Sequence, residues 1–187
     1  MKWKDIIVGH MLNIRSEDII GSQGLQTYMH SILLIDRGSF ENPASYLDRN
    51  TYFFRRSATS VQQEAKSTTD VDNESLKQAV AEFASNLEVR KVLETTPSMS
   101  DADVKGLWQS ISVKSKGCND IINHICHERA RPSVTEGEVA KSPQYKAWVK
   151  AMHGALRQRL TYGASSPSTG LVMAVLGYHE CKRRLSA

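Results

Sequence analysis

The chain has 187 residues, of which 40% are hydrophobic and 24% are charged, and its formal net charge at pH 7 is +4. This length and composition are typical of one globular domain that buries its core without disulfides or metals. Three cysteines without repeated spacing argue against a disulfide framework, and no stretch approaches the about 20 apolar residues of a transmembrane helix. We therefore expect a reducing compartment such as the cytoplasm, no secretion and no membrane partner.

The first part of the chain contains two helical patterns. Residues 2–14 place apolar side chains at helical spacing, and residues 25–35 place them over more than half of the circumference. We expect the second helix to be buried on most sides. Asn42 before Pro43 has the cap-and-proline pattern of a helix start and opens a short aromatic segment.

That aromatic segment is Tyr52-Phe53-Phe54, and it is followed directly by Arg55 and Arg56. Aromatic and basic side chains together can stack a base and pair with a phosphate. Alternatively, the aromatic rings belong to the core and the arginines mark its solvated edge, because aromatic side chains are mostly buried. Arg55 and Arg56 are therefore candidate nucleic-acid contacts with a structural alternative.

Residues 57–73 are polar and almost without apolar side chains, which predicts a loop or linker. This linker would separate an N-terminal helical part, residues 1–56, from a C-terminal helical part, residues 74–187. We expect one compact all-α domain of about six to eight helices, with two helical lobes as the alternative.

The middle of the chain is acidic. A helix capped by Asn73 is expected to run to residue 93, and another to run from about residue 100 to an end between residues 112 and 117. Residues 60–104 hold nine acidic and four basic side chains. The outer face of the first helix should therefore be negatively charged.

Residues 118–131 are the one place where metal-ligand residue types cluster. On a helix, one side would carry a carboxylate, two histidines and a second carboxylate, namely Asp120, His124, His127 and Glu128. Such a set could hold zinc or perform acid–base chemistry, although the order matches no zincin motif. The alternative is a solvated polar face, so we expect no metal here, and Cys118 and Cys126 should be buried and inert.

A helix marked at both ends follows. Ser142 is a good N-cap, Pro143 suits the first turn, and Gly163 suits the left-handed residue past the end. Residues 139–187 hold eight basic side chains and one acidic side chain, a net charge of +7. Within this helix, four donors at spacings of four, three and four form one row: Lys146, Lys150, His153 and Arg157.

The last helix should be central, because it is apolar on nearly every side up to His179. It ends in Lys182, Arg183 and Arg184. Three cations at a helix C-terminus compensate the helix dipole, and they could equally contact phosphates. Both interpretations stay open at this point.

These patterns favour a non-catalytic helical subunit that binds RNA or DNA through the phosphate backbone with little sequence specificity. Opposite charges in the middle and at the end of the chain could join copies head to tail, as in a capsid, nucleocapsid or effector complex. One alternative is a protein-interaction or assembly module without nucleic acid. A second is a metal-dependent enzyme using His124, His127 and Glu128. No sequence motif indicates a cofactor.

Overall fold

The computed structural model describes residues 24–36, 43–54, 71–95, 104–133 and 136–186. All regular structure within these ranges is helical, which confirms the all-α fold. The expected helix at residues 2–14, most of the 57–73 linker, and Arg55 and Arg56 lie outside the described residues. The α-helices are α3 (Gly24–Ile35), α4 (Pro43–Arg49), α5 (Asn73–Ser85), α6 (Leu87–Glu94), α7 (Val104–Ala130), α8 (Pro143–Thr161) and α9 (Thr169–Leu185).

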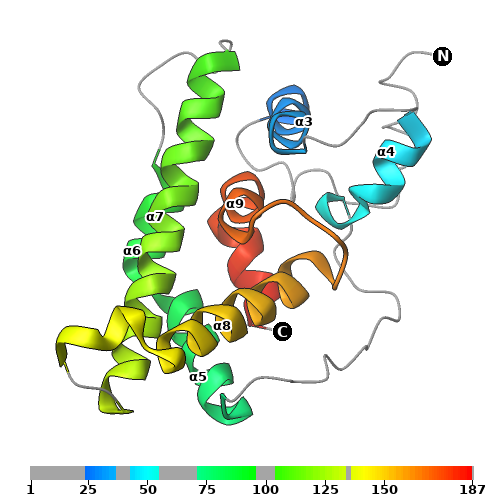
Figure 1. Cartoon of the computed structure of the whole chain (residues 1–187). Coiled ribbons are helices and arrows are strands. Elements are labelled where there is room, and N and C mark those ends of the chain that lie inside the picture. Colours follow the sequence, from blue (N-terminus) through cyan, green and yellow to red (C-terminus); the bar gives the residue numbers. More distant parts are fainter. Residues whose placement is uncertain (1–23, 37–42, 55–70, 96–103, 134–135, 187) are drawn as a thin grey trace.

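Three short 3-10 helices connect these elements: η2 (Thr51–Phe53), η3 (Arg131–Ser133) and η4 (Glu136–Lys141). Helix α9 lies at the centre of the arrangement, between α7, α8 and α3 (Figure 1), and it also contacts α5 and α6. Its central position confirms the expectation drawn from its apolar circumference. Side chains from both sides of the 57–73 stretch, such as Phe53, Phe83 and Met173, belong to one hydrophobic core.

The aromatic segment before Arg55 is part of that core. Tyr52, Phe53 and Phe54 are all buried. The hydroxyl of Tyr28 in α3 donates to the carbonyl of Phe53 at 2.7 Å, and its ring meets Phe53 and Phe54 edge to face. The rings therefore belong to the core, as the structural interpretation predicts, and rings held in the core cannot stack a base.

The helix expected from Asn73 to residue 93 is two helices. Its cap is Asp72, whose carboxylate accepts from the Ser75 amide at 2.8 Å. The chain then breaks at Asn86, whose side chain caps α6 by accepting from the Glu88 amide at 2.8 Å. The backbone is extended at Asn86, and Leu87, which stands four residues after the buried Phe83, is 69% exposed. A capping asparagine here outweighs the continuous apolar pattern.

In α7 the difference is reversed, because two expected helices are one helix. The sequence suggested a helix end between residues 112 and 117 and a new helix after it, but α7 continues through Gly117. A Cβ atom on Gly117 would lie 2.8 Å from Cγ1 of Val92 in α6. Gly117 therefore allows α6 to approach α7 closely, and it is a packing residue rather than a helix breaker.

Helix α9 is interrupted at Gly177, where φ is 74° and ψ is 171°. This region of backbone space is essentially limited to glycine. The thiol of Cys181, one turn later, donates to the carbonyl of Met173 at 3.7 Å and so bridges the interruption. The chain can thus change direction within the core without opening it to solvent.

Replacing Gly177 with alanine is expected to lower the free energy of unfolding by about 1–3 kcal/mol, because alanine is strained at this φ. The added methyl group would meet no atom within 4 Å, so the loss comes from the backbone and not from a clash. Urea unfolding followed by circular dichroism measures the change.

Gly154→Ala in α8 is the matched control for that substitution. Gly154 is exposed, and a Cβ atom there would also meet nothing within 4 Å. Because glycine disfavours an α-helix, alanine at this position should raise the free energy of unfolding by about 1 kcal/mol. Equal effects of the two alanine substitutions would show that alanine is not strained at position 177.

Candidate nucleic-acid interface

Helix α8 begins and ends where the sequence indicates. The Ser142 hydroxyl accepts from the Tyr145 amide at 3.1 Å, and Pro143 occupies the first turn. At the other end, Tyr162 and Gly163 both have left-handed backbone conformations, with φ of 55° and 80°. The two ends satisfy backbone groups of the first and last turns and set the limits of the helix.

The apolar side of α8 faces the core as expected. Met152, Leu156 and Leu160 are fully buried, and Trp148 and Val149 pack against the core from partly buried positions. The helix contacts α5, α7, α9, η2 and η4, so neighbouring elements enclose most of its circumference. Only a narrow part of α8 is left to solvent.

Beyond its first two residues, α8 exposes four positions, which we call the exposed strip: Lys146, Lys150, Gly154 and Arg157. Their spacings of four, four and three keep them on one line along the helix. At a rise of 1.5 Å per residue, the strip is about 16 Å long. Three cations and a glycine therefore form the whole solvent-facing line of this helix.

The three cations of the exposed strip have no carboxylate within ion-pair distance among the described residues. An unpaired surface cation stays hydrated and available to an anion, whereas a paired one must first lose its partner. The strip is therefore a line of available positive charge.

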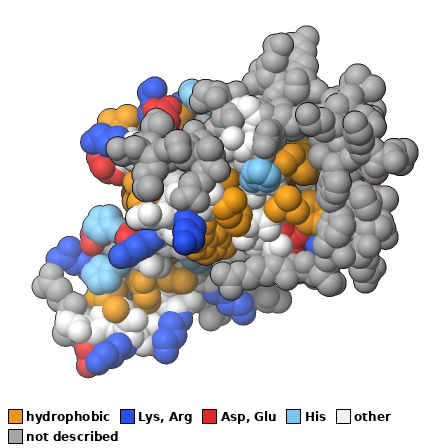
Figure 2. Space-filling model, turned by 90° about the horizontal axis from the view of Figure 1, so that it is seen from above, with side chains coloured by type: hydrophobic (Ala, Val, Ile, Leu, Met, Phe, Trp, Pro, Cys, Tyr) orange, Lys and Arg blue, Asp and Glu red, His pale blue; other side chains and the backbone are white. Residues whose placement is uncertain are grey.

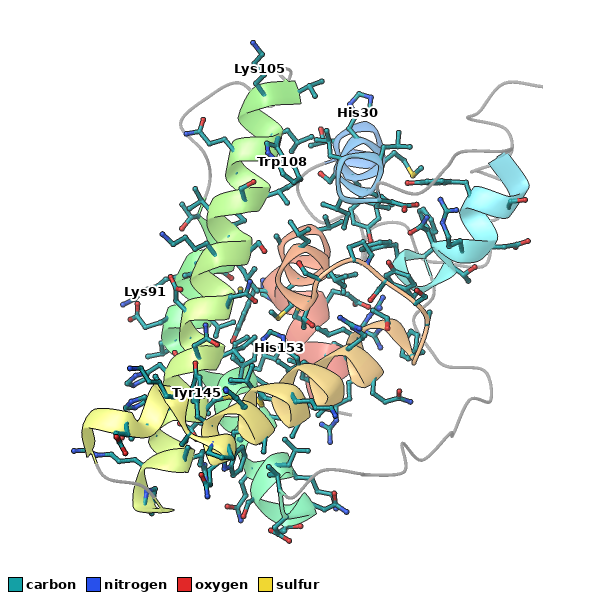
Figure 3. The ribbon with its side chains drawn as sticks, in the orientation of Figure 1. His30, Lys91, Lys105, Trp108, Tyr145 and His153 are labelled. Atoms are coloured by element: carbon teal, nitrogen blue, oxygen red, sulfur yellow. The ribbon has the colours of Figure 1, made fainter. Side chains whose placement is uncertain are left out.

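The structure separates His153 from the other members of the predicted row. Its side chain is half-buried and lies on the side of α8 toward α9 (Figure 3). Burial, and next the charge of Arg157, lower the pKa of His153 below its usual value. His153 is thus mostly neutral at pH 7, and it adds little to the charge of the exposed strip.

The cationic end of α9 divides into exposed and buried members. Lys182 is exposed, and its amine lies 5.8 Å from the ring centre of Tyr178. Arg184 is buried, pairs with the buried Glu180 at 2.6 Å and donates to the carbonyl of Leu160. Arg183 is 41% exposed in its side chain and also pairs with Glu180, at 2.6 Å.

Arg184 is therefore a structural residue, and its expected role as a nucleic-acid contact is wrong. Its guanidinium is held in the core, where no phosphate can reach it without breaking the pair. The signal for this pair was present in the sequence, because Glu180 precedes Arg183 by three residues and Arg184 by four. That spacing is typical of ion pairs on one helix face.

The acidic face of α5 and α6 is neutralised within the chain. Glu88 pairs with Lys91 at 2.6 Å, Glu94 pairs with Arg90 at 2.9 Å, and Glu82 reaches Arg129 of α7 at 2.7 Å. Figure 3 shows Lys91 pointing away from the molecule. The described acidic residues of these helices therefore do not form the free negative surface that head-to-tail pairing between copies would need.

The metal-ligand cluster suggested in α7 does not assemble. His127 lies 3.5 Å from Glu128, but no three His, Cys, Asp or Glu side chains come together as a metal site in the described part of the chain. The His127 ring of α7 instead meets the ring of Tyr145 of α8 edge to face, and Tyr145 is labelled in Figure 3. His127 and Tyr145 therefore form a contact between α7 and α8.

The cysteines are buried as expected. Burial raises the pKa of Cys118 and of Cys126 to about 12, and it raises the pKa of Cys181 well above the usual value of a thiol. A thiol with such a pKa is protonated at pH 7 and is a poor nucleophile.

Hydrophobic side chains are also visible at the surface. Seen from above, Lys and Arg side chains of the described residues lie on the surface with hydrophobic side chains exposed beside them (Figure 2). The exposed large hydrophobic residues of the described ranges come from three helices: Leu33, Leu87, Val104 and Val113. Single exposed residues of this kind are common and do not define an interface.

Comparison with protein-family models, with curated proteins and with solved structures finds no match for this chain. None of the described helices is long and apolar enough to span a membrane. The candidate site is therefore defined by the geometry and charge of α8.

Proposed function

We propose that this protein is a non-catalytic helical subunit that binds nucleic acid through the phosphate backbone. The exposed strip of α8 is the observation that carries the proposal. Lys146, Lys150 and Arg157 face solvent on one line and have no carboxylate partner in the described ranges. Phosphate contacts of this kind position a polyanion without reading its sequence.

The strip sets an expectation for affinity. Three phosphate contacts are few, so the dissociation constant at physiological salt should fall in the range of nonspecific binding, about 10⁻⁴ to 10⁻⁶ M. Lys182 and the partly exposed Arg183 at the end of α9 are secondary contacts, and Glu180 already offsets part of the charge of Arg183. Arg55 and Arg56 remain candidates from the sequence.

The test of the proposal is the salt dependence of binding to a labelled oligonucleotide, measured by fluorescence anisotropy. If three phosphates are neutralised, the logarithm of the association constant should fall with the logarithm of salt with a slope of about −2 for a single strand. For duplex DNA the slope should be about −3. Random and fixed sequences should bind alike.

Two results would contradict the proposal. The first is the absence of salt-sensitive binding to either form of nucleic acid. The second is a strong preference for one base sequence, because contacts from the exposed strip to phosphates carry no sequence information. Nucleic acid that copurifies and is removed by a high-salt wash would add support.

A further inference from the structure

Gly154 differs from Gly117 and Gly170, two helical glycines that pack closely against other residues. A Cβ atom on Gly117 would meet Val92 at 2.8 Å, and one on Gly170 would meet the Ser115 hydroxyl at 2.6 Å. Packing between helices therefore requires glycine at both positions. A Cβ atom on Gly154 would meet nothing within 4 Å, and its φ is not left-handed. Neither packing in the described residues nor backbone conformation explains a glycine there, although glycine weakens a helix.

The position of Gly154 is informative. It lies on the exposed strip, four residues after Lys150 and three before Arg157. The line of cations is therefore interrupted by a residue without a side chain, where the helix backbone is exposed. Glycine allows a ligand to approach the backbone more closely than any other residue. Here the ligand would approach between two positive charges.

The shape of the surface limits how a nucleic acid can lie on it. Because α8 is enclosed by α5, α7, α9, η2 and η4, it cannot enter a major groove as a recognition helix does. Beyond its first turn, its exposed positions offer no amide, hydroxyl or aromatic side chain for reading or stacking bases. With no groove to enter and no side chain for stacking bases, the lysines and the arginine of α8 are left to contact phosphates.

We infer that one sugar–phosphate strand lies lengthwise along the exposed strip, pairs with Lys146, Lys150 and Arg157, and approaches α8 most closely at Gly154. The inference rests on the function proposed above. It assigns to Gly154 the role of a notch that lets the strand reach the cations on both sides. Loss of the notch should lower affinity even though no charge changes.

The experiment compares Gly154→Leu with the unmodified protein in binding a labelled single strand of about 20 nucleotides at fixed salt. Leucine should weaken binding about tenfold, because its side chain fills the gap and separates the strand from the cations. The melting temperature should not fall, since leucine favours a helix and the site is open. Gly154→Ala, a smaller addition, should weaken binding about twofold to threefold, and it serves if the leucine variant does not fold.

Ala81→Leu is the matched control, because Ala81 is an exposed residue of α5 and not of α8. It should bind within about twofold of the unmodified protein. If Gly154→Leu also binds within twofold while Lys150→Ala weakens binding, the role assigned to Gly154 is wrong and the proposed function stands. If the unmodified protein shows no salt-sensitive binding, both are overturned.

Discussion

Replacing Lys146, Lys150 and Arg157 together with glutamate is expected to abolish salt-sensitive binding of nucleic acid. Each cation that neutralises a phosphate contributes about 0.7–0.9 to the salt slope, so affinity at about 0.1 M salt should fall at least about a hundredfold. Reversal adds repulsion to the lost contacts. Fluorescence anisotropy over a salt series measures both the affinity and the slope, which should fall to the small value that Lys182 and Arg183 can supply.

The control for this triple substitution keeps the charges and changes the side chains. Lys146→Arg, Lys150→Arg and Arg157→Lys together should bind about as well as the unmodified protein, because nonspecific phosphate contacts depend mainly on charge. Both triple variants should unfold at nearly the same temperature, since the replaced side chains are exposed. Strong binding by the glutamate variant would remove α8 from the proposal.

Glu180→Gln is expected to have the largest effect on stability, about 3–5 kcal/mol. Glu180 is 4% exposed, and the side chain of its partner Arg184 is fully buried. Removing the carboxylate charge leaves a guanidinium in the core without compensation, which costs far more than losing a surface pair. Urea unfolding gives the difference in free energy.

The double variant Glu180→Leu with Arg184→Met separates the charge from the packing. When both partners become apolar, no charge is left buried, so the double variant should be more stable than Glu180→Gln. The same loss in both variants would show that hydrogen bonds of Arg184, such as the one to the Leu160 carbonyl, matter more than its charge.

Acid should remove the contribution of Glu180. Burial raises the pKa of its carboxyl group, but hydrogen bonds from Arg183 and the charge of Arg184 outweigh burial and hold the pKa below its usual value. The stabilisation is therefore complete above the pKa of an unfolded glutamate and is lost as the pH falls through the lower pKa of the folded state. The stability difference between the unmodified protein and Glu180→Gln should shrink over the same range.

The sequence predicts the presence of helices in this fold better than it predicts where each helix ends. The helix class, the caps of α8 and the central place of α9 follow from periodicity and from residues such as Ser142 and Gly163. The ends of α5 and α7 do not. The expected helix up to residue 93 is broken at Asn86, which caps a new helix, and the expected helix end near Gly117 is absent, because Gly117 packs against Val92. The second difference depends on a tertiary contact, which local propensity does not report.

The candidate site shows the same limit. Lys146, Lys150 and Arg157 share an exposed line because helical geometry places them there. His153 and Arg184 look equally basic in sequence, yet the first lies toward α9 and the second is held by Glu180. Which cations remain available depends on neighbours that are distant along the chain, and periodicity does not report them.

The contact between Gly117 and Val92 has an evolutionary consequence. Because the space beside position 117 is filled by the valine, a larger residue there can be accepted only together with a smaller one at position 92. Relatives of this protein should therefore change the two positions in concert. Such paired substitution would mark the α6–α7 contact in an alignment without any coordinates.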